Sequence, residues 1–479
     1  MIAEQQNRPS VVNAPVEPVG LPGLNFHFPF SERRVLLLTI DTLLVAAVAW
    51  LVDQSGMGAG LTAEGRYWLP VLLGGWWLLA GLNDLYDVPS SSDTTLAVIR
   101  LFVTGLTAQV VYVIAHALAP ELPGAHVFFR YLAPILLAVG LWRWLYALAF
   151  DRPPFYHRVL IIGGGRAAQT IAGCLRQGPG IKCKVTGYVD DAATGGDGSE
   201  DLPYLGQEAD LPEVVRRWRI HEVVVATEKT VDQRLFQLLV DCQAHGMRVS
   251  WMPDVYSRLY RRIPMEYIDP TWALYAMQGR RIFSPLQQLS KRLLDLVVVL
   301  AALPILLLII VPVAIAIRLD SEGPAFYRQI RVGRANEPFC IFKFRTMFVD
   351  AEKDGRARWA TEDDDRITRV GSLLRKSRLD ELPQILNVLR GEMSLVGPRP
   401  ERPEFIAELQ EQIPFYRTRL MVKPGITGWA QVQYSYGSTT EDALIKLQHD
   451  FYYIQYWSFW TDLYILYRTV GVMLGLKGR

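Results

Sequence analysis

The residues best suited to phosphate chemistry lie between positions 343 and 435. Asp380 and Glu381 are adjacent carboxylates, Arg375 precedes them by about one helical turn, and Arg399 follows between two prolines. One carboxylate can attack phosphorus, a second can hold Mg²⁺ against the phosphate charge, and guanidinium groups bind the phosphate oxygens. The set therefore predicts phosphoryl transfer to a carboxylate.

Local patterns predict the elements that hold these residues. Lys343 and Arg345 occupy alternate positions of a short strand-like run. Around Pro383, apolar residues recur at helical spacing from Leu382 to Leu389, and Gly391 follows as a C-terminal signal. Asp380 and Glu381 thus lie at a helix N-terminus, where the helix dipole favours anions. An acidic helix cap is the structural alternative, and the neighbouring arginines favour a site.

The same region carries several motifs in a fixed order. They are Lys291-Arg292-x-x-Asp295, Lys343-Phe344-Arg345-Thr346-Met347, Asp380-Glu381-Leu382-Pro383-Gln384, Gly397-Pro398-Arg399-Pro400 and Lys423-Pro424-Gly425-Ile426-Thr427-Gly428-Trp429-Ala430-Gln431. With these motifs the segment 285–479 resembles the bacterial sugar transferases, which are monotopic polyprenyl-phosphate hexose-1-phosphate transferases. The whole chain resembles the long members of that family, which start exopolysaccharide or O-antigen synthesis.

The resemblance implies a ping-pong reaction on a UDP-sugar at the inner bacterial membrane, with the soluble domains in the cytoplasm. Asp380 would attack the β-phosphate, expel UMP and carry the sugar phosphate until undecaprenyl phosphate takes it. Glu381 would bind the cofactor Mg²⁺ and assist deprotonation. The remaining implied phosphate and nucleotide contacts are Arg375, Arg399, either Lys343 or Arg345, and Lys423 with Thr427. A homodimer is expected, and the net charge of +2 argues against a nucleic-acid partner.

The mean hydropathy of +0.14 indicates a membrane block joined to soluble blocks. Four apolar runs, near 35–52, 67–82, 98–119 and 131–150, predict four transmembrane helices within 31–150. Arginines flank the block outside its ends, which predicts that both ends are cytoplasmic. Asp41 interrupts the first run, and we expect it to face other helices as a paired structural acid, with an ion site as the alternative.

A fifth apolar run, 293–317, stands alone downstream and contains Pro304 and Pro312. A spanning helix here would put the soluble segments on either side of it across the membrane from each other. We therefore expect a re-entrant helix over 292–318, although the family's Ser-Pro bend is replaced by Leu307-Leu308. The last apolar stretch, around Tyr453, Trp460 and Asp462, is either an interfacial helix or part of the core.

The middle segment, 155–265, alternates short β-branched runs with helical ones and predicts a Rossmann-like α/β domain. Strands are expected near 158–162, 184–189, 222–226 and 248–251. Gly163 and Gly165 fit the turn of a dinucleotide fold, and Asp190 follows the second strand, where an acid would meet a ribose. Nucleotide binding and a structural, dimerising or regulatory role both remain open. The segment has no Tyr-x-x-x-Lys, so reductase chemistry is not supported.

The expected organisation is a disordered tail over 1–30, the helical block, the middle domain, a linker over 266–284 and an α-rich catalytic domain over 285–479. The four cysteines lack the spacing of a metal site and predict buried reduced thiols. Two other functions stay open. Asp363-x-Asp365 could serve a metal-dependent glycosyltransferase, and the chain could be a non-catalytic membrane scaffold. The sugar is undetermined, with glucose weakly favoured over galactose.

Overall fold

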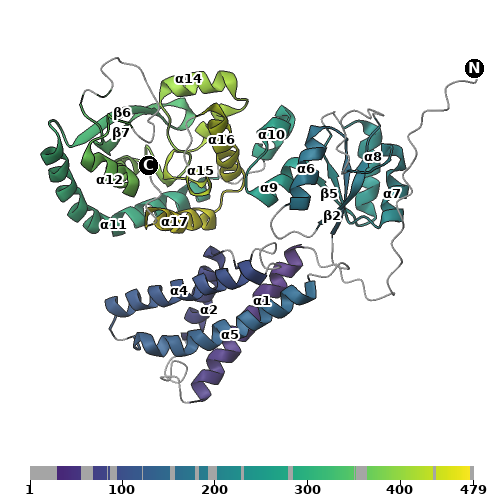
Figure 1. Cartoon of the computed structure of the whole chain (residues 1–479), viewed down its shortest axis with the longest axis horizontal. Helices are drawn as coiled ribbons and strands as arrows, with labels where there is room; N and C mark the ends of the chain where they lie inside the picture. The colour runs from purple at the N-terminus through teal and green to yellow at the C-terminus, as the bar shows by residue number, and fades with distance from the viewer. Residues whose placement is uncertain are drawn as a thin grey trace, which may run out of the picture. The chain divides into compact units, whose positions relative to one another are not determined.

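The computed structural model describes residues 30–55, 68–83, 85–86, 94–120, 122–150, 157–177, 183–191, 202–227, 231–278, 284–349, 351, 364–434 and 439–474 (Figure 1). The chain divides into two compact units, Met1–Val255 and Tyr256–Arg479. The first unit holds four N-terminal helices and an α/β sheet, and the second holds the candidate site. The expected N-terminal tail lies outside the described residues, apart from its last residue, Phe30.

Four apolar helices form the N-terminal block: α1 (Phe30–Gln54), α2 (Trp68–Leu82), α4 (Thr94–Leu118) and α5 (Ala125–Phe150). Helix α5 packs against α1 and α4, and α2 packs against α4. Helices form at all four predicted positions, and three of them, α1, α4 and α5, are long and apolar enough to cross a membrane. Helix α2 has 15 residues. At about 1.5 Å per residue it is shorter than the ~30 Å hydrocarbon core.

Asp41 lies on α1 with its side chain buried inside this block. Its Oδ2 accepts a hydrogen bond from Nη2 of Arg143 on α5 at 2.6 Å, and Arg143 is buried as well. The apolar surroundings leave a charge few partners, so the two helices pair their charges with each other. The predicted paired structural acid is confirmed.

The middle domain is a five-stranded parallel sheet with strand order β3-β2-β1-β4-β5. Its strands are β1 (His157–Ile162), β2 (Cys183–Val189), β3 (Tyr204–Gly206), β4 (Glu222–Val225) and β5 (Arg248–Trp251). Its helices are α6 (Arg166–Gln177), α7 (Leu211–Trp218) and α8 (Gln233–Ala244), with η2 (Glu208–Asp210) before α7. The four predicted strands and the α/β architecture are confirmed, whereas the short β3 was not predicted.

The end of the middle domain differs from the prediction. The second compact unit begins at Tyr256, before the predicted boundary at residue 265. The chain here forms α9 (Met252–Tyr260), η3 (Met265–Tyr267) and α10 (Pro270–Gln278). Met265 and Ala273 are buried in one apolar cluster with Leu409 and Phe451. The first part of the predicted linker 266–284 therefore belongs to the core of the second unit.

The second unit contains a two-stranded antiparallel ribbon, β6 (Phe326–Val332) with β7 (Pro338–Phe344), and a short parallel pair, β8 (Ser394–Val396) with β9 (Gly425–Thr427). Short 3₁₀ turns are η5 (Arg334–Asn336), η6 (Leu379–Gln384) and η7 (Tyr416–Met421). The remaining helices are α11 (Pro285–Asp320), α12 (Arg369–Ser377), α13 (Ile385–Arg390), α14 (Pro403–Gln412), α15 (Trp429–Gln433), α16 (Thr440–Gln455) and α17 (Phe459–Leu474).

Helix α11 is attached to this unit at both of its ends. Near its start, Asp295 accepts hydrogen bonds from Ser394 Oγ at 3.0 Å and Leu395 N at 2.9 Å. At its last residue, Asp320 Oδ2 accepts from the backbone N–H of Val370 at 3.0 Å. The helix contains both prolines and bends along its length (Figure 1). Its middle is exposed, with Leu308 76% accessible.

The C-terminal helix pair contributes buried side chains to the core. Asp462 on α17 accepts hydrogen bonds from Lys291 Nζ at 2.6 Å and from the Tyr453 hydroxyl at 2.7 Å. Both Asp462 and Tyr453 are buried, whereas Trp460 is 64% exposed. For Tyr453 and Asp462, core packing is therefore the correct alternative.

Candidate active site

A sharp turn between two helices presents the carboxylate pair. Helix α12 ends at Ser377, and Arg378 takes a left-handed conformation with φ of 58°. Asp380 and Glu381 follow in the first turn of η6, which leads directly into α13. Gly391 closes α13 with φ of 80°, a conformation that glycine adopts without steric cost. The predicted helix and its C-terminal glycine are confirmed, with a 3₁₀ first turn.

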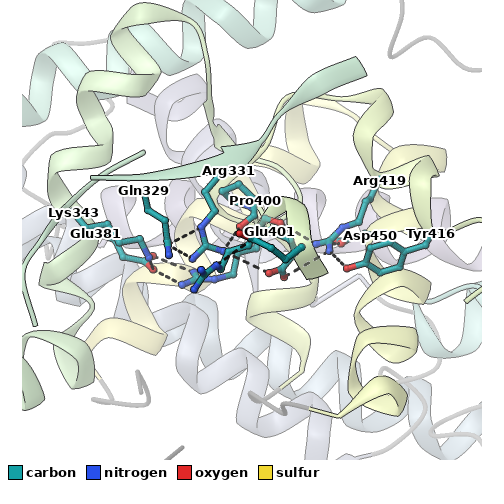
Figure 2. A network of polar contacts seen from close by, with 12 residues as sticks. Gln329, Arg331, Lys343, Glu381, Pro400, Glu401, Tyr416, Arg419 and Asp450 are labelled. Carbon is teal, nitrogen blue, oxygen red and sulfur yellow. Dashed lines mark hydrogen bonds and ion pairs between the residues drawn. The ribbon is translucent and has the colours of Figure 1, made fainter. Parts of the chain in front are cut away.

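Two cations hold the carboxylate of Glu381. Arg399 donates from Nη2 to Oε1 at 2.5 Å and from Nη1 to Oε2 at 3.3 Å. Lys343, on β7, donates from Nζ to Oε1 at 3.2 Å. Glu381 is only 6% exposed, so these charged bonds offset the cost of burying its charge. Figure 2 shows Lys343 and Glu381 directed toward each other at one end of a larger polar network.

Asp380 has a different environment. It is half-buried and lines a cavity, and no hydrogen bond to its carboxylate is formed by the residues that the structure describes. Burial, reinforced by the Glu381 charge, raises the pKa of Asp380 above its ordinary value. Burial also acts to raise the pKa of Glu381, but the Arg399 and Lys343 cations lower it by more. The pair thus combines a more basic carboxylate, Asp380, which is unpaired within the described ranges, with a strongly acidic one, Glu381, which two cations hold.

The cavity has a volume of about 500 Å³, within the range of small-molecule sites. Six of the predicted site residues line it: Lys343, Arg345, Arg375, Asp380, Glu381 and Arg399. The lining also includes further cations that were not predicted as site residues: Arg331, Arg366, Arg378, Arg402, Arg419 and Lys446. With many more cations than carboxylates, the cavity is suited to a multiply charged anion such as a diphosphate.

Arg375 and Arg345 both line the cavity but differ in their hydrogen-bond partners. Nη1 of Arg375 is buried and has no partner among the described residues, so it is free to bind an anion. Arg345 instead donates from Nη2 to the carbonyl and hydroxyl of Ser321, at 2.7 and 2.8 Å, and from Nη1 to the Glu322 carbonyl. It therefore fixes the chain after α11. Of the two candidate upstream cations, Lys343 is the one that contacts the acid pair.

Lys423 and Thr427 were predicted site residues, but neither is among the described residues that line the cavity. Thr427 is buried on β9, and its hydroxyl lies 2.7 Å from that of Thr469. The main chain of this stretch does support the site. The Gly397 N–H donates to the Thr427 carbonyl, and the Gly425 N–H donates to the Pro398 carbonyl, both at 2.9 Å. Main-chain hydrogen bonds from this stretch therefore hold the loop that carries Arg399.

Arg331 on β6 and Arg419 on η7 were not predicted as site residues, for different reasons. Arg331 and Gln329 share one face of β6 and form hydrogen bonds with each other. The alternation of polar residues in this strand was the available signal. Arg419 lies in a 3₁₀ turn that has no periodicity to mark it, and its partners are distant in sequence.

The donors at the acid pair fit Mg²⁺. Carboxylate oxygens are hard ligands, and Mg²⁺ in proteins is commonly held by one or two carboxylates together with substrate phosphates. No group of three or more His, Cys, Asp or Glu side chains gathers anywhere in the described ranges, so a site built from protein alone is not present there. For the glycosyltransferase alternative, Asp363 lies outside the described residues, and the adjacent Asp364 pairs with Arg366 at 2.6 Å.

Comparison with known proteins places two families on the chain. The bacterial sugar transferase family matches residues 286–475, and a family described as a CoA-binding domain matches residues 81–253. A UDP-N-acetylgalactosamine-undecaprenyl-phosphate N-acetylgalactosaminephosphotransferase of Aeromonas hydrophila is 44% identical over 238 residues, 50% of this chain and 55% of the relative.

Several relatives are named UDP-glucose:undecaprenyl-phosphate glucose-1-phosphate transferase. The one from Xanthomonas campestris pv. campestris is 34% identical over 325 residues, 67% of each chain. The one from Caulobacter vibrioides is 47% identical over 192 residues, 39% of this chain and 70% of the relative. The aligned segments thus span between 55% and 70% of these relatives.

The glycine turn of the middle domain is contacted by a carboxylate of the chain itself. Gly163 has φ of 108°, which a tight strand-to-helix turn requires with or without a ligand. The N–H of Gly164 donates to Asp190 Oδ2 at 2.8 Å. A carboxylate of the chain thus accepts a hydrogen bond from the backbone of the turn. The expected nucleotide contacts of Gly163, Gly165 and Asp190 stay predictions.

Proposed function

Since the chain belongs to the bacterial sugar transferase family, we propose that it transfers a sugar 1-phosphate from a UDP-sugar to undecaprenyl phosphate and releases UMP. The observation that carries the proposal is the acid pair. A carboxylate that no described residue pairs with faces a cation-lined cavity, beside a second carboxylate that two cations hold. The product would start synthesis of an exopolysaccharide or O-antigen.

In the first step a carboxylate oxygen of Asp380 attacks the β-phosphorus. The new bond joins Asp380 to this phosphorus, and the bond from it to the bridging oxygen breaks. UMP departs with that oxygen. In the second step an oxygen of undecaprenyl phosphate attacks the same phosphorus and releases Asp380 as a carboxylate. The raised pKa of Asp380 makes its ionised form a stronger nucleophile than an ordinary carboxylate.

The other residues of the cavity stabilise charge. Arg375, whose buried Nη1 has no partner among the described residues, and Arg399, bound to Glu381, would bind phosphate oxygens that gain charge as the bridging bond breaks. Lys343 and Arg399 keep Glu381 ionised and oriented. Glu381, with Asp380, would hold Mg²⁺, which when bound offsets the charge of the diphosphate.

Helix α11 would enter and leave the membrane by the same face. Both of its ends contact the same folded unit, through Asp295 at one end and Asp320 at the other. A soluble domain lies on one side of a bilayer, so a helix bound to it at both ends cannot deliver its C-terminus to the other side. The bend and the exposed apolar middle fit this topology (Figure 1). It would place the cavity at the cytoplasmic surface, where the lipid phosphate lies.

The proposal is tested by the nucleotide released. The full chain in detergent or nanodiscs is given undecaprenyl phosphate and each member of a panel of UDP-sugars, because its relatives differ in the sugar that they are named for. We expect UMP with at least one sugar, and no UMP from Asp380→Asn, whose amide is not a nucleophile for phosphorus. Release of UDP would contradict the proposal, since a glycosyltransferase produces UDP.

A further inference from the structure

The loop that carries Arg399 is anchored by a second arginine that was not recognised in the sequence. Arg419, on η7, is 6% exposed. Its Nη2 donates to the backbone carbonyl of Arg399 at 3.0 Å and lies 3.0 Å from Asp450 Oδ2. Its Nη1 donates to the Tyr416 hydroxyl at 2.7 Å. A guanidinium buried in this way requires such partners, so its position is strongly fixed.

A third arginine anchors the next residue of the loop. Arg331 donates from Nη1 to the carbonyl of Pro400 at 3.2 Å, and its Nε and Nη2 donate to Gln329 Oε1. The carboxylate of Glu401 lies between the two arginines, 3.7 Å from Arg331 and 3.7 Å from Arg419. Figure 2 shows this row of residues running from Gln329 through Pro400 and Glu401 to Arg419 and Tyr416. Consecutive carbonyls of the loop are thus bound from β6 and from η7.

The backbone between these anchors has little freedom. Pro398 and Pro400 fix their own φ angles on either side of Arg399. A Cβ at Gly397 would collide with the Lys423 carbonyl, so the loop also lies tightly against the strand that follows it. A displacement of the Arg399 carbonyl therefore moves the whole residue, including its side chain.

The interaction of Arg399 with Glu381 is sensitive to such a displacement. Its two distances are 2.5 and 3.3 Å, so a shift of about 1 Å away would carry the longer bond beyond hydrogen-bond range. Misplacement on this scale is enough to lower catalytic rates by about 100-fold.

We propose that Arg419 is a positioning residue of the transfer reaction: it holds the main chain of Arg399 so that this guanidinium can bind both oxygens of Glu381. The inference rests on the proposed function. In this role Arg419 acts on the substrate through Arg399, although it borders the cavity. Its own terminal nitrogens contact Arg399, Asp450 and Tyr416.

The test is a double-mutant cycle between Arg419→Lys and Arg399→Lys, read as kcat and KM for UMP release by the full chain. Lysine keeps the charge beside Asp450 but cannot bind the carbonyl and the carboxylate in the same geometry. We expect Arg419→Lys alone to lower kcat by about 10- to 100-fold with little change in KM, as for other supporting residues. In the Arg399→Lys background the same change should cost less than about twofold, because the interaction that it supports is already lost.

Arg417→Lys is the matched control, since Arg417 lies on the same turn but is exposed. It should leave both parameters unchanged. Circular dichroism and gel filtration verify that each variant is folded. If Arg419→Lys does not fold, Tyr416→Phe, which removes one acceptor of Arg419, takes its place in the cycle with a smaller expected loss.

Additive losses in the cycle would overturn the inference, because they would mean that Arg419 acts independently of Arg399. A rise in KM with kcat unchanged would also overturn it and would indicate direct substrate binding. A kcat of Arg419→Lys equal to that of the wild type would likewise overturn the inference. Failure of the proposed function is separate, since the wild-type chain would then release no UMP.

Discussion

Replacing Arg399 by lysine tests whether the bidentate ion pair with Glu381 is required for catalysis. The substitution keeps the positive charge but leaves a single ammonium, which cannot bind both carboxylate oxygens as the guanidinium does at 2.5 and 3.3 Å. Loss of one hydrogen bond to a charged group costs about 1.5–3 kcal/mol. If that bond is fully present in the transition state, kcat/KM for UMP release should fall by about 10- to 150-fold.

The assay is the initial rate of UMP release over a range of UDP-sugar concentrations, with Arg417→Lys as the exposed control. Arg399→Met removes the charge as well and should be slower than Arg399→Lys. The reasoning is refuted if Arg399→Lys retains activity within about twofold of the wild type, because the second hydrogen bond would then contribute nothing to the reaction.

Three further predictions concern the membrane block, the core and the metal. Removing either partner of the buried Asp41–Arg143 pair should destabilise the helices by about 3–5 kcal/mol, whereas Asp41→Leu with Arg143→Met should restore most of the loss. Hydrogen exchange of α1 measures this, and a double variant as unstable as the single ones would contradict it. Burial lowers the pKa of His449 to about 4, below the ~6.5 of an unfolded chain. The unfolded chain therefore binds the proton more tightly, and up to about 3 kcal/mol of stability, present above pH ~6.5, should be lost as the pH falls toward 4. Denaturant titrations of His449→Gln should lack this slope and those of His245→Gln, an exposed control, should keep it; equal slopes in wild type and His449→Gln would contradict the assignment. EDTA should abolish UMP release and excess Mg²⁺ should restore it, and activity unaffected by EDTA would exclude the proposed role of Glu381 with the metal.

Much of the site was predictable because its signals are local. The helical spacing after Pro383 and the glycine at 391 placed Asp380 and Glu381 at the start of a helix, and the structure confirms this. The alternation of the β-branched runs likewise located four strands of the middle sheet. Such patterns reflect which side chains share a face of one element, and that is fixed by backbone geometry alone.

Contacts between distant segments could not be derived in this way. Lys343 and Arg345 were equivalent in the strand pattern, but β7 ends at Phe344, so Arg345 leaves the strand alternation and binds the chain after α11. Thr427 belongs to a conspicuous motif, but its hydroxyl is paired with Thr469 in the core. The partners of Arg419 are brought to it only by the fold.

The end of the middle domain was missed for a related reason. The stretch from residue 263 to 274 holds short helices separated by prolines, without a long apolar period. It reads as a linker, although Met265 and Ala273 are buried against α14 and α16. Whether an isolated apolar residue is buried depends on which distant segment covers it, and the local sequence pattern does not show which segment that is.

The central claim is that Asp380 carries the sugar phosphate between the two half-reactions. The most direct test is to incubate the full chain with its UDP-sugar in the absence of lipid acceptor and to analyse its peptides by mass spectrometry. The account predicts one covalent sugar phosphate on the peptide that contains Asp380, with UMP released in equal amount, and loss of the adduct when undecaprenyl phosphate is added. Full-rate UMP release by Asp380→Asn, or an adduct on another residue, would contradict it.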